Sequence, residues 1–222
     1  MDLTSDVLAA CHALFAPGQV TEVRILEIPG RNGFKFNAAG WFNDWQKLAE
    51  TANSYHQRNP PGIYVTINPL HTACLARASN EVVERLRETS ADRDVVARTW
   101  LPIDLDPVRP TGVSSTNEEL LAARTVAGRI VAYLEQELGF PPGLKAHSGN
   151  GIHLLYRIDL RNDDVGKELV RSALEGLAAR FNDGRVKVDT SLHNASRILK
   201  LWGTVTRKGQ HTGERPHRQS RL

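Results

Sequence analysis

The sequence predicts an α+β fold, in which helices pack on one face of a sheet. Short apolar segments such as Ile63–Ile67 and Val186–Asp189 alternate with longer segments whose apolar residues recur at helical spacing. Two further segments, Leu144–Ser148 and Ile152–Ile158, flank Gly149-Asn150-Gly151. Because Asn-Gly favours the positive φ angles of tight turns, these segments predict an antiparallel hairpin. A mixed order of strands and helices with such a hairpin is typical of α+β folds.

Capping residues predict where the helices begin and end. Asn43 and Asn162 are predicted N-caps, and Ser115 and Thr116 supply overlapping capping boxes for a helix that Gly139 closes. The expected helices therefore span about 43–58, 80–88, 115–139 and 162–181. A strand is expected over 95–106, between the second and third helices.

Composition indicates a globular protein without a disulfide framework. The 222 residues carry a net charge of +3, which permits a nucleic-acid partner without requiring one. The two cysteines, Cys11 and Cys74, lie far apart, so no cysteine-rich zinc site is expected. No apolar run approaches the ~20 residues of a membrane helix, and Met1–Phe15 lacks the basic cluster of a signal peptide. We expect a cytoplasmic protein without a membrane partner.

The segment Leu101–Pro107 carries the first chemical signal. Side chains alternate between the two faces of a strand, so Asp104 and Asp106 share one face while Ile103 and Leu105 point into the core. Two carboxylates this close repel each other unless a cation or a proton lies between them. Hard oxygen ligands suit Mg²⁺ or Mn²⁺. A pair of simply solvated acids at a strand end is the alternative.

The predicted hairpin carries the second signal, Ser148-Gly149-Asn150-Gly151-Ile152-His153. Glycines allow backbone N–H groups to turn toward an anion, and Ser148 and His153 add donors. His153 and Arg157 share a strand face and together would form a phosphate clamp. An ordinary hairpin with a satisfied histidine is the alternative.

The third signal follows the strand that ends at Asp189. Arg197 and Lys200 lie three residues apart, so they share a face if that segment is helical. The three signals together supply three carboxylates, a glycine turn, a histidine and several cations. A nucleotidyl transferase needs this set, because carboxylates hold two metals and cations hold a triphosphate.

These motifs resemble the archaeo-eukaryotic primase superfamily, in particular the primase-polymerases of phages, plasmids and CRISPR-associated systems. That family has an Asp-x-Asp on a strand, a Ser-x-His-type element and a later hydrophobic-Asp. They stand here as Ile103–Pro107, Ser148–His153 and Val188-Asp189, with Asn194–Lys200 after the last. The resemblance is specific from about Trp100 to Arg218 and weaker over the first 95 residues.

The resemblance implies an RRM-like catalytic sheet over residues 96–222, fused to an N-terminal α/β unit over residues 1–95. It implies that Asp104, Asp106 and Asp189 bind the two metals and act in catalysis. The incoming nucleotide would contact Ser148, Gly149, Asn150, Gly151, His153, Arg197 and Lys200. Further candidates for nucleotide or phosphate contacts are Asn68, Arg109, Lys145, Arg157, Lys208, Arg215 and Arg218.

For the template strand, the sequence points to the N-terminal half. Arg31, Lys35, Trp41 and Trp45 mix cations with aromatics, which suits single-stranded nucleic acid. The alternative is that Trp41 and Trp45 are one apolar face of a helix.

The expected activity is template-directed nucleotidyl transfer on single-stranded DNA, by de novo priming and by extension of a primer 3′ end. Two Mg²⁺ or Mn²⁺ ions per site are expected, and no zinc. The choice between dNTPs and NTPs stays open, as does the question of partner domains or replication and CRISPR proteins. Relatives often continue into further domains, so the chain is expected to be either an excised core or a small stand-alone protein.

Two other classes fit the sequence less well. A nucleotide-sugar glycosyltransferase also uses Asp-x-Asp with Mn²⁺, but has no clear need for Asp189 or for Ser148–His153. A non-catalytic RRM-like binder should expose aromatics on its sheet, where this chain has acids and a histidine. Three acids facing a polyanion would cost affinity in the absence of metal.

Overall fold

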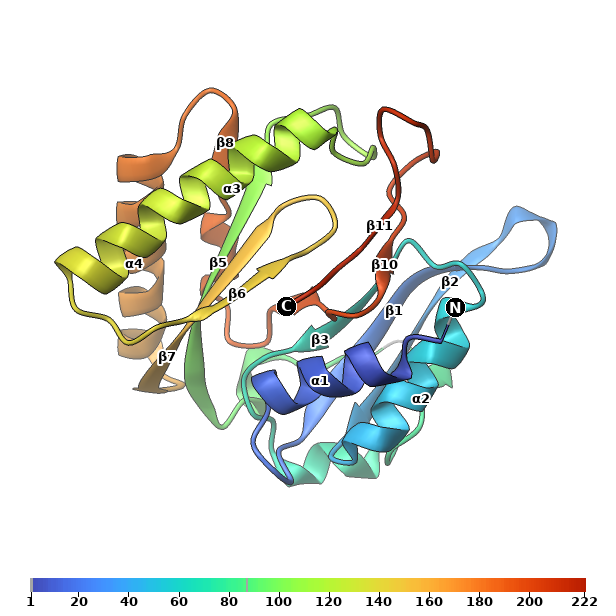
Figure 1. Cartoon of the computed structure of the whole chain (residues 1–222). Helices are drawn as coiled ribbons and strands as arrows, with labels where there is room; N and C mark the ends of the chain where they lie inside the picture. The colour runs from blue at the N-terminus through green and yellow to red at the C-terminus, as the bar shows by residue number, and fades with distance from the viewer. Residues whose placement is uncertain (1, 87) are drawn as a thin grey trace.

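The computed structural model describes residues 2–86 and 88–222 and has an α+β fold, as the sequence predicts (Figure 1). The longer helices are α1 (Thr4–Leu14), α2 (Trp45–His56), α3 (Asn117–Val131) and α4 (Asp164–Phe181). Short helical turns cover Arg31–Gly33, Thr72–Ala76, Asp92–Asp94, Ala132–Glu137 and Thr190–His193. The strands are β1 (Thr21–Pro29), β2 (Lys35–Phe42), β3 (Gly62–Thr66), β4 (Val83–Glu84), β5 (Ala97–Pro107), β6 (Leu144–His147), β7 (Ile152–Arg161), β8 (Val186–Val188), β9 (Ile198–Lys200), β10 (Val205–Thr206) and β11 (Arg218–Gln219).

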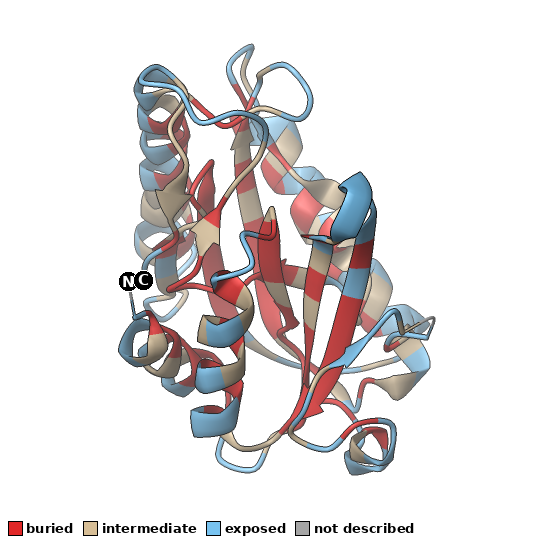
Figure 2. Ribbon diagram, turned by 90° about the vertical axis from the view of Figure 1, so that its right-hand side faces the viewer, coloured by how far each residue is buried: buried red, intermediate tan, exposed pale blue. Residues whose placement is uncertain are grey.

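Two antiparallel sheets organise the chain. The N-terminal sheet has the strand order β4-β2-β1-β3-β9, and the C-terminal sheet has the order β6-β7-β5-β8. α1 and α2 pack on one face of the N-terminal sheet (Figure 1), because alternate residues of β1 such as Val23 and Ile25 bury against them. The strands are largely buried, while exposed residues gather on the outer sides of the helices (Figure 2).

The C-terminal sheet is built in the order β5-α3-β6-β7-α4-β8, and α3 and α4 cover one of its faces (Figure 1). The predicted alternation along β5 is confirmed: Ile103 and Leu105 are buried in the core. α3 begins at the predicted capping box, in which Thr116 Oγ1 accepts from the Glu119 N–H and Glu119 accepts from the Thr116 N–H. The carboxylates of β5 therefore lie on the face that the helices leave uncovered.

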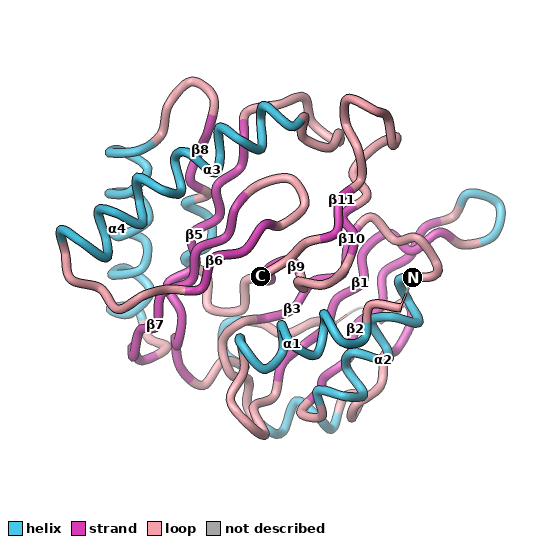
Figure 3. The backbone as a smooth tube through the Cα atoms, in the orientation of Figure 1, coloured by secondary structure: helices cyan, strands magenta, loops and turns pink. Residues whose placement is uncertain are grey.

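The C-terminal segment, residues 198–222, forms backbone pairs with both sheets. β9 pairs with β3 at the edge of the N-terminal sheet, with Lys200 opposite Tyr64. Close to the end of the chain, Arg221 forms a β-bridge with His147 at the edge of the other sheet. Figure 3 shows β9, β10 and β11 lying between the two groups of strands. The predicted boundary between residues 95 and 96 therefore divides the sequence but not the sheets, because residues 198–200 complete the N-terminal one.

Two predicted N-caps are wrong. The N-cap of α2 is Asp44 and that of α4 is Asp163, each one residue after the predicted cap. Asn43 and Asn162 instead hold distant segments, since Asn43 accepts from Asn80, and Asn162 donates to backbone carbonyls of residues 92 and 95.

The helix predicted over 80–88 is also wrong for its described residues; position 87 lies outside them. Asn80 and Arg85 have positive φ angles, which an α-helix does not accommodate. Val83 and Glu84 instead form β4, which pairs with β2. None of the helices in the described part of the chain is both long and apolar enough to cross a lipid bilayer.

Acid is expected to destabilise the contact between α2 and the C-terminal segment. His56, buried at the end of α2, lies against Arg207, with 3.0 Å between Nε2 and Nη2. Burial, then the charges of Arg207 and Lys200, lower the pKa of His56 from 6.5 to about 4. The unfolded chain therefore binds a proton that the folded protein excludes, so stability present above pH 6.5 is lost as the pH falls toward 4. Urea unfolding should show a loss of up to about 3 kcal/mol over this range. The loss should be absent in His56→Gln, and an unchanged pH profile in that variant would contradict this role.

Candidate active site

A cleft of about 790 Å³ lies between the uncovered faces of the two sheets. Asp104, Asp106 and Asp189 line it, together with His153 from the neighbouring strand β7. Residues of the N-terminal sheet form the opposite wall. The cleft thus brings Asp189 to the same place as Asp104 and Asp106, which lie more than 80 residues earlier in the sequence.

Asp104 and His153 are direct neighbours across β5 and β7. The Trp202 indole donates to His153 Nδ1 at 3.1 Å, so in the neutral ring the proton lies on Nε2. That nitrogen is 3.5 Å from Asp104 Oδ1, and Oδ1 is buried without a hydrogen-bond partner. His153 thus presents an N–H donor beside a carboxylate oxygen that has an unfilled acceptor site.

Asp189 is positioned by the backbone next to Asp104. It follows β8 directly, and its N–H donates to the Asp104 carbonyl at 2.9 Å. Its Oδ1 accepts from the Ser191 N–H at 2.8 Å and so caps the helical turn Thr190–His193. One carboxylate oxygen of Asp189 therefore has a structural partner, while the side chain still lines the cleft.

The electrostatics of the pair on β5 favour a cation. Burial, and then the charge of Asp104, raise the pKa of Asp106, although 46% of its side chain remains exposed. Arg109 offsets part of this effect by donating to Asp106 Oδ1 at 3.1 Å. The remaining repulsion between the carboxylates is what a bound cation would relieve.

The oxygen ligands fit a hard divalent cation, but they are not yet close enough together to coordinate one. Carboxylate oxygens at a shared cleft, one of them buried and unpartnered on Asp104, are the ligands that Mg²⁺ and Mn²⁺ take. Within residues 2–86 and 88–222, no three Asp, Glu, His or Cys side chains already converge closely enough to hold an ion. Asp104, Asp106 and Asp189 could hold metal after side-chain rotation, and Asp189 would give up part of its cap.

The glycine turn is placed at the cleft, but its backbone donors are already used. Ser148 Oγ accepts from the Gly151 N–H at 2.9 Å, and His147 Nδ1 accepts from the Gly149 N–H at 2.8 Å. The predicted backbone cradle for an anion is therefore wrong in this conformation. Gly151 has another role: a Cβ there would lie 2.3 Å from the Leu105 carbonyl oxygen, so glycine allows the turn to pack on β5.

Asn150 supplies the donor that the turn itself does not. Its Oδ1 accepts from the Ser115 N–H at 2.9 Å, which fixes the amide. Its Nδ2 is buried without a partner, and Asn150 lines the cleft. A buried N–H without an acceptor costs stability, so an anionic ligand in the cleft would satisfy it.

Arg197 and Lys200 reach the cleft from a strand edge rather than from a helix. The segment is not helical, since Arg197 directly precedes the strand β9, so the condition for a shared helical face is not met. Arg197 donates to Ser191 Oγ, and the buried Lys200 donates to the Val205 carbonyl at 3.0 Å. Burial, and the charges of Arg207 and Lys208, lower the pKa of Lys200. Lys208 also lines the cleft.

Three residues that were predicted to contact phosphate make structural interactions outside the cleft. Asn68 is buried and joins the Ala195 carbonyl to the Thr99 N–H. Arg157 lies 3.6 Å over the Trp100 ring, so the predicted clamp with His153 is not formed. Lys145 pairs with Glu135 on another side of the C-terminal sheet. None of these three side chains lines the cleft.

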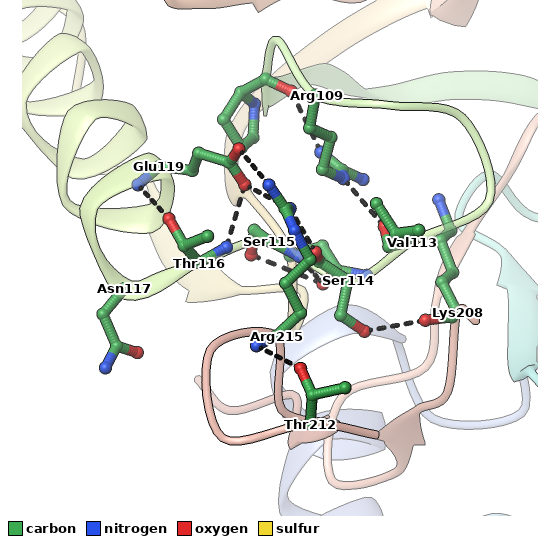
Figure 4. Close-up of polar contacts among 12 residues, drawn as sticks. Arg109, Val113, Ser114, Ser115, Thr116, Asn117, Glu119, Lys208, Thr212 and Arg215 are labelled. Atoms are coloured by element: carbon green, nitrogen blue, oxygen red, sulfur yellow. Dashed lines mark hydrogen bonds and ion pairs between the residues drawn. The ribbon is translucent and has the colours of Figure 1, made fainter. Parts of the chain in front are cut away.

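Arg215, just before β11, and Arg218, within it, make structural contacts. Figure 4 shows Arg215 pointing at Glu119 at the start of α3, and the two side chains form an ion pair of 2.9 Å. Arg218 donates to the Ser115 carbonyl and to Asn117. Both tie the C-terminal segment to the start of α3, and neither lines the cleft.

The predicted template residues are also placed elsewhere. Trp41 lies on β2, fully buried, with its indole N–H on Ser90 Oγ, and Trp45 is buried at the start of α2. Their rings offer no surface for stacking a base, so that interpretation is corrected. Arg31 and Lys35 are exposed at the β1–β2 hairpin, outside the cleft lining, and Lys35 pairs with Glu27.

The sequence reasoning missed Arg24 and Tyr64, which line the cleft from β1 and β3. Each sits in a strand of ordinary alternation, so no local motif marks it; only the pairing of the strands brings it to the carboxylates. In comparisons with known proteins, no family model matches the chain and no curated protein matches it.

Proposed function

We propose that this protein is a metal-dependent primase-polymerase, which joins nucleotides on a single-stranded DNA template. The placement of Asp104, Asp106 and Asp189 along one cleft carries the proposal. A nucleotidyl transferase needs such a carboxylate group beside donors for a triphosphate. The resemblance of these motifs to the archaeo-eukaryotic primase superfamily points to the same chemistry.

The connectivity of the C-terminal sheet supports the proposal. Its βαββαβ order, with strands arranged β6-β7-β5-β8, is the arrangement expected of an RRM-like or ferredoxin-like unit. In that arrangement the first and third strands, β5 and β7, lie side by side at the centre. They carry Asp104 and His153 on the face that is free of helices.

The side chains divide the work between two ligands. Mg²⁺ or Mn²⁺ held by the three aspartates would activate a 3′-hydroxyl and stabilise the leaving pyrophosphate. The Nε2–H of His153 and the unpartnered Nδ2 of Asn150 are donors for the triphosphate. Lys208 adds positive charge at the cleft, and the buried Lys200 lies on the opposite wall. Fixed donors of this kind stabilise developing negative charge without reorganisation.

The proposal is tested by incubating the protein with single-stranded DNA, either unprimed or carrying a primer. Labelled dNTPs or NTPs and Mg²⁺ or Mn²⁺ are added, and products are resolved by size. We expect products on both templates, and the nucleotide that gives them identifies the preferred sugar. Extension of the primed template alone would restrict the activity to a polymerase. No synthesis on either template, with intact binding of single strands, would overturn the enzymatic proposal in favour of a binding module.

A further inference from the structure

A row of three side chains crosses the wall of the cleft that faces the carboxylates. Arg24 on β1 is directly opposite Tyr64 on β3, and Tyr64 is directly opposite Lys200 on β9. Residues opposite each other in antiparallel strands share a face, and all three line the cleft. Lys200 Nζ lies 5.7 Å from the Tyr64 ring centroid. The row therefore places a guanidinium and a buried amine on either side of an aromatic ring.

Arg24 is held in place from below. Its Nη2 donates to Glu22 Oε2 at 2.8 Å and to the Ser90 carbonyl at 2.9 Å. Glu22 is fully buried, and its Oε2 also accepts from the Ser90 N–H. No described residue accepts from Arg24 Nε. The guanidinium is thus fixed through one nitrogen and retains donors for an anion in the cleft.

The Tyr64 ring is positioned next to Arg24 by Gly62. A Cβ at Gly62 would lie 2.6 Å from the Tyr64 ring, so glycine lets the ring lie against the strand. The charges of Asp104 and Asp106 contribute, after burial, to a raised pKa of the Tyr64 phenol, which agrees with its place across from the carboxylates. A ring beside a guanidinium can stack on a base while the guanidinium meets a backbone phosphate.

We propose that the row Arg24–Tyr64–Lys200 binds single-stranded nucleic acid and leads it to the carboxylates. Tyr64 stacks on a base, Arg24 contacts a backbone phosphate, and Lys200 marks the end of the row nearest the incoming nucleotide. This inference rests on the proposed function for its biological meaning. Strand binding by the row is nevertheless measurable without synthesis.

The test is the affinity for a fluorescently labelled oligothymidylate, measured by anisotropy without metal or nucleotide. Tyr64→Leu should weaken binding about tenfold or more, within the range that loss of one stacked base produces. Tyr64→Phe should retain binding. Arg24→Gln should weaken binding and lower the salt dependence by about one phosphate contact. Tyr64→Leu leaves the Glu22–Arg24 pair untouched, so the test survives if Arg24→Gln fails to fold.

Matched controls lie outside the cleft. Phe34→Leu removes an exposed ring at the β1–β2 hairpin, and Lys145→Ala removes a cation; both should bind like the wild type. Unchanged binding in Tyr64→Leu would overturn the inference. Weakened binding of dTTP with unchanged binding of the oligonucleotide would assign the row to the nucleotide and overturn it too.

The outcomes separate the two proposals. A wild-type protein that binds strands through the row but synthesises nothing keeps this inference and loses the proposed function. If the wild-type protein synthesises normally and the row variants bind strands as well as the wild type does, the proposed function is kept and this inference is lost.

Discussion

Replacing Asp104 with asparagine is expected to reduce nucleotide incorporation more than about 100-fold. Mutating a residue that only hydrogen-bonds a metal ligand already lowers activity or metal affinity about 10–100-fold, and Asp104 would be a ligand itself. The amide keeps the volume of the carboxylate but not its charge. It should leave the fold intact, because Asp104 Oδ1 has no hydrogen-bond partner to lose and its charge repels Asp106. Single-turnover incorporation on a primed template measures the effect.

A second readout separates metal binding from chemistry. Mg²⁺ or Mn²⁺ should raise the Tm of the wild-type protein, because a ligand that binds the folded state stabilises it. The rise should be much smaller in Asp104→Asn. Asp159→Asn is the matched control, since Asp159 is exposed on β7 and does not line the cleft. Equal incorporation by Asp104→Asn and Asp159→Asn would contradict the role of Asp104.

Replacing Glu22 with alanine is expected to lower the free energy of unfolding by about 3–5 kcal/mol, the usual cost of removing one partner from a buried ion pair. Glu22 is fully buried, and the substitution leaves Arg24 without its carboxylate and the Ser90 N–H without its acceptor. Urea unfolding at neutral pH measures the loss.

The control is an exposed pair of similar geometry. Glu168 pairs with Arg171 on α4 at 3.1 Å, and its side chain is 60% exposed. Glu168→Ala should change stability by at most about 1 kcal/mol. If the two alanine variants lose the same stability, the Glu22–Arg24 pair does not anchor the wall of the cleft.

The parts of the fold that depend on local sequence could be predicted. The alternation that puts Asp104 and Asp106 on one face, the Thr116 capping box and the hairpin ending at His147 and Ile152 all follow from neighbouring residues. Their positions are set by strand period and by turn and cap chemistry, which act over a few residues.

The errors arise where a distant partner decides. Asn43 offers the same cap chemistry as Asp44, but Asn80 engages it. Arg215 reads as a free phosphate ligand until Glu119 is found beside it. Trp41 reads as a template contact until the segment that carries Ser90 covers it. Arg24 and Tyr64 carry no motif, and only the register of β1, β3 and β9 makes them neighbours.

The pairing of β3 with β9 has a kinetic consequence. β3 cannot pair with β9 until Lys200, the partner of Tyr64, has been synthesised, more than 130 residues after Tyr64. Contacts between residues so distant in sequence raise the contact order and slow folding. During synthesis the β3 edge therefore stays unpaired until residues 198–200 have left the ribosome, and an unpaired edge can associate with other chains. A chaperone that shields this edge would raise the yield of folded protein.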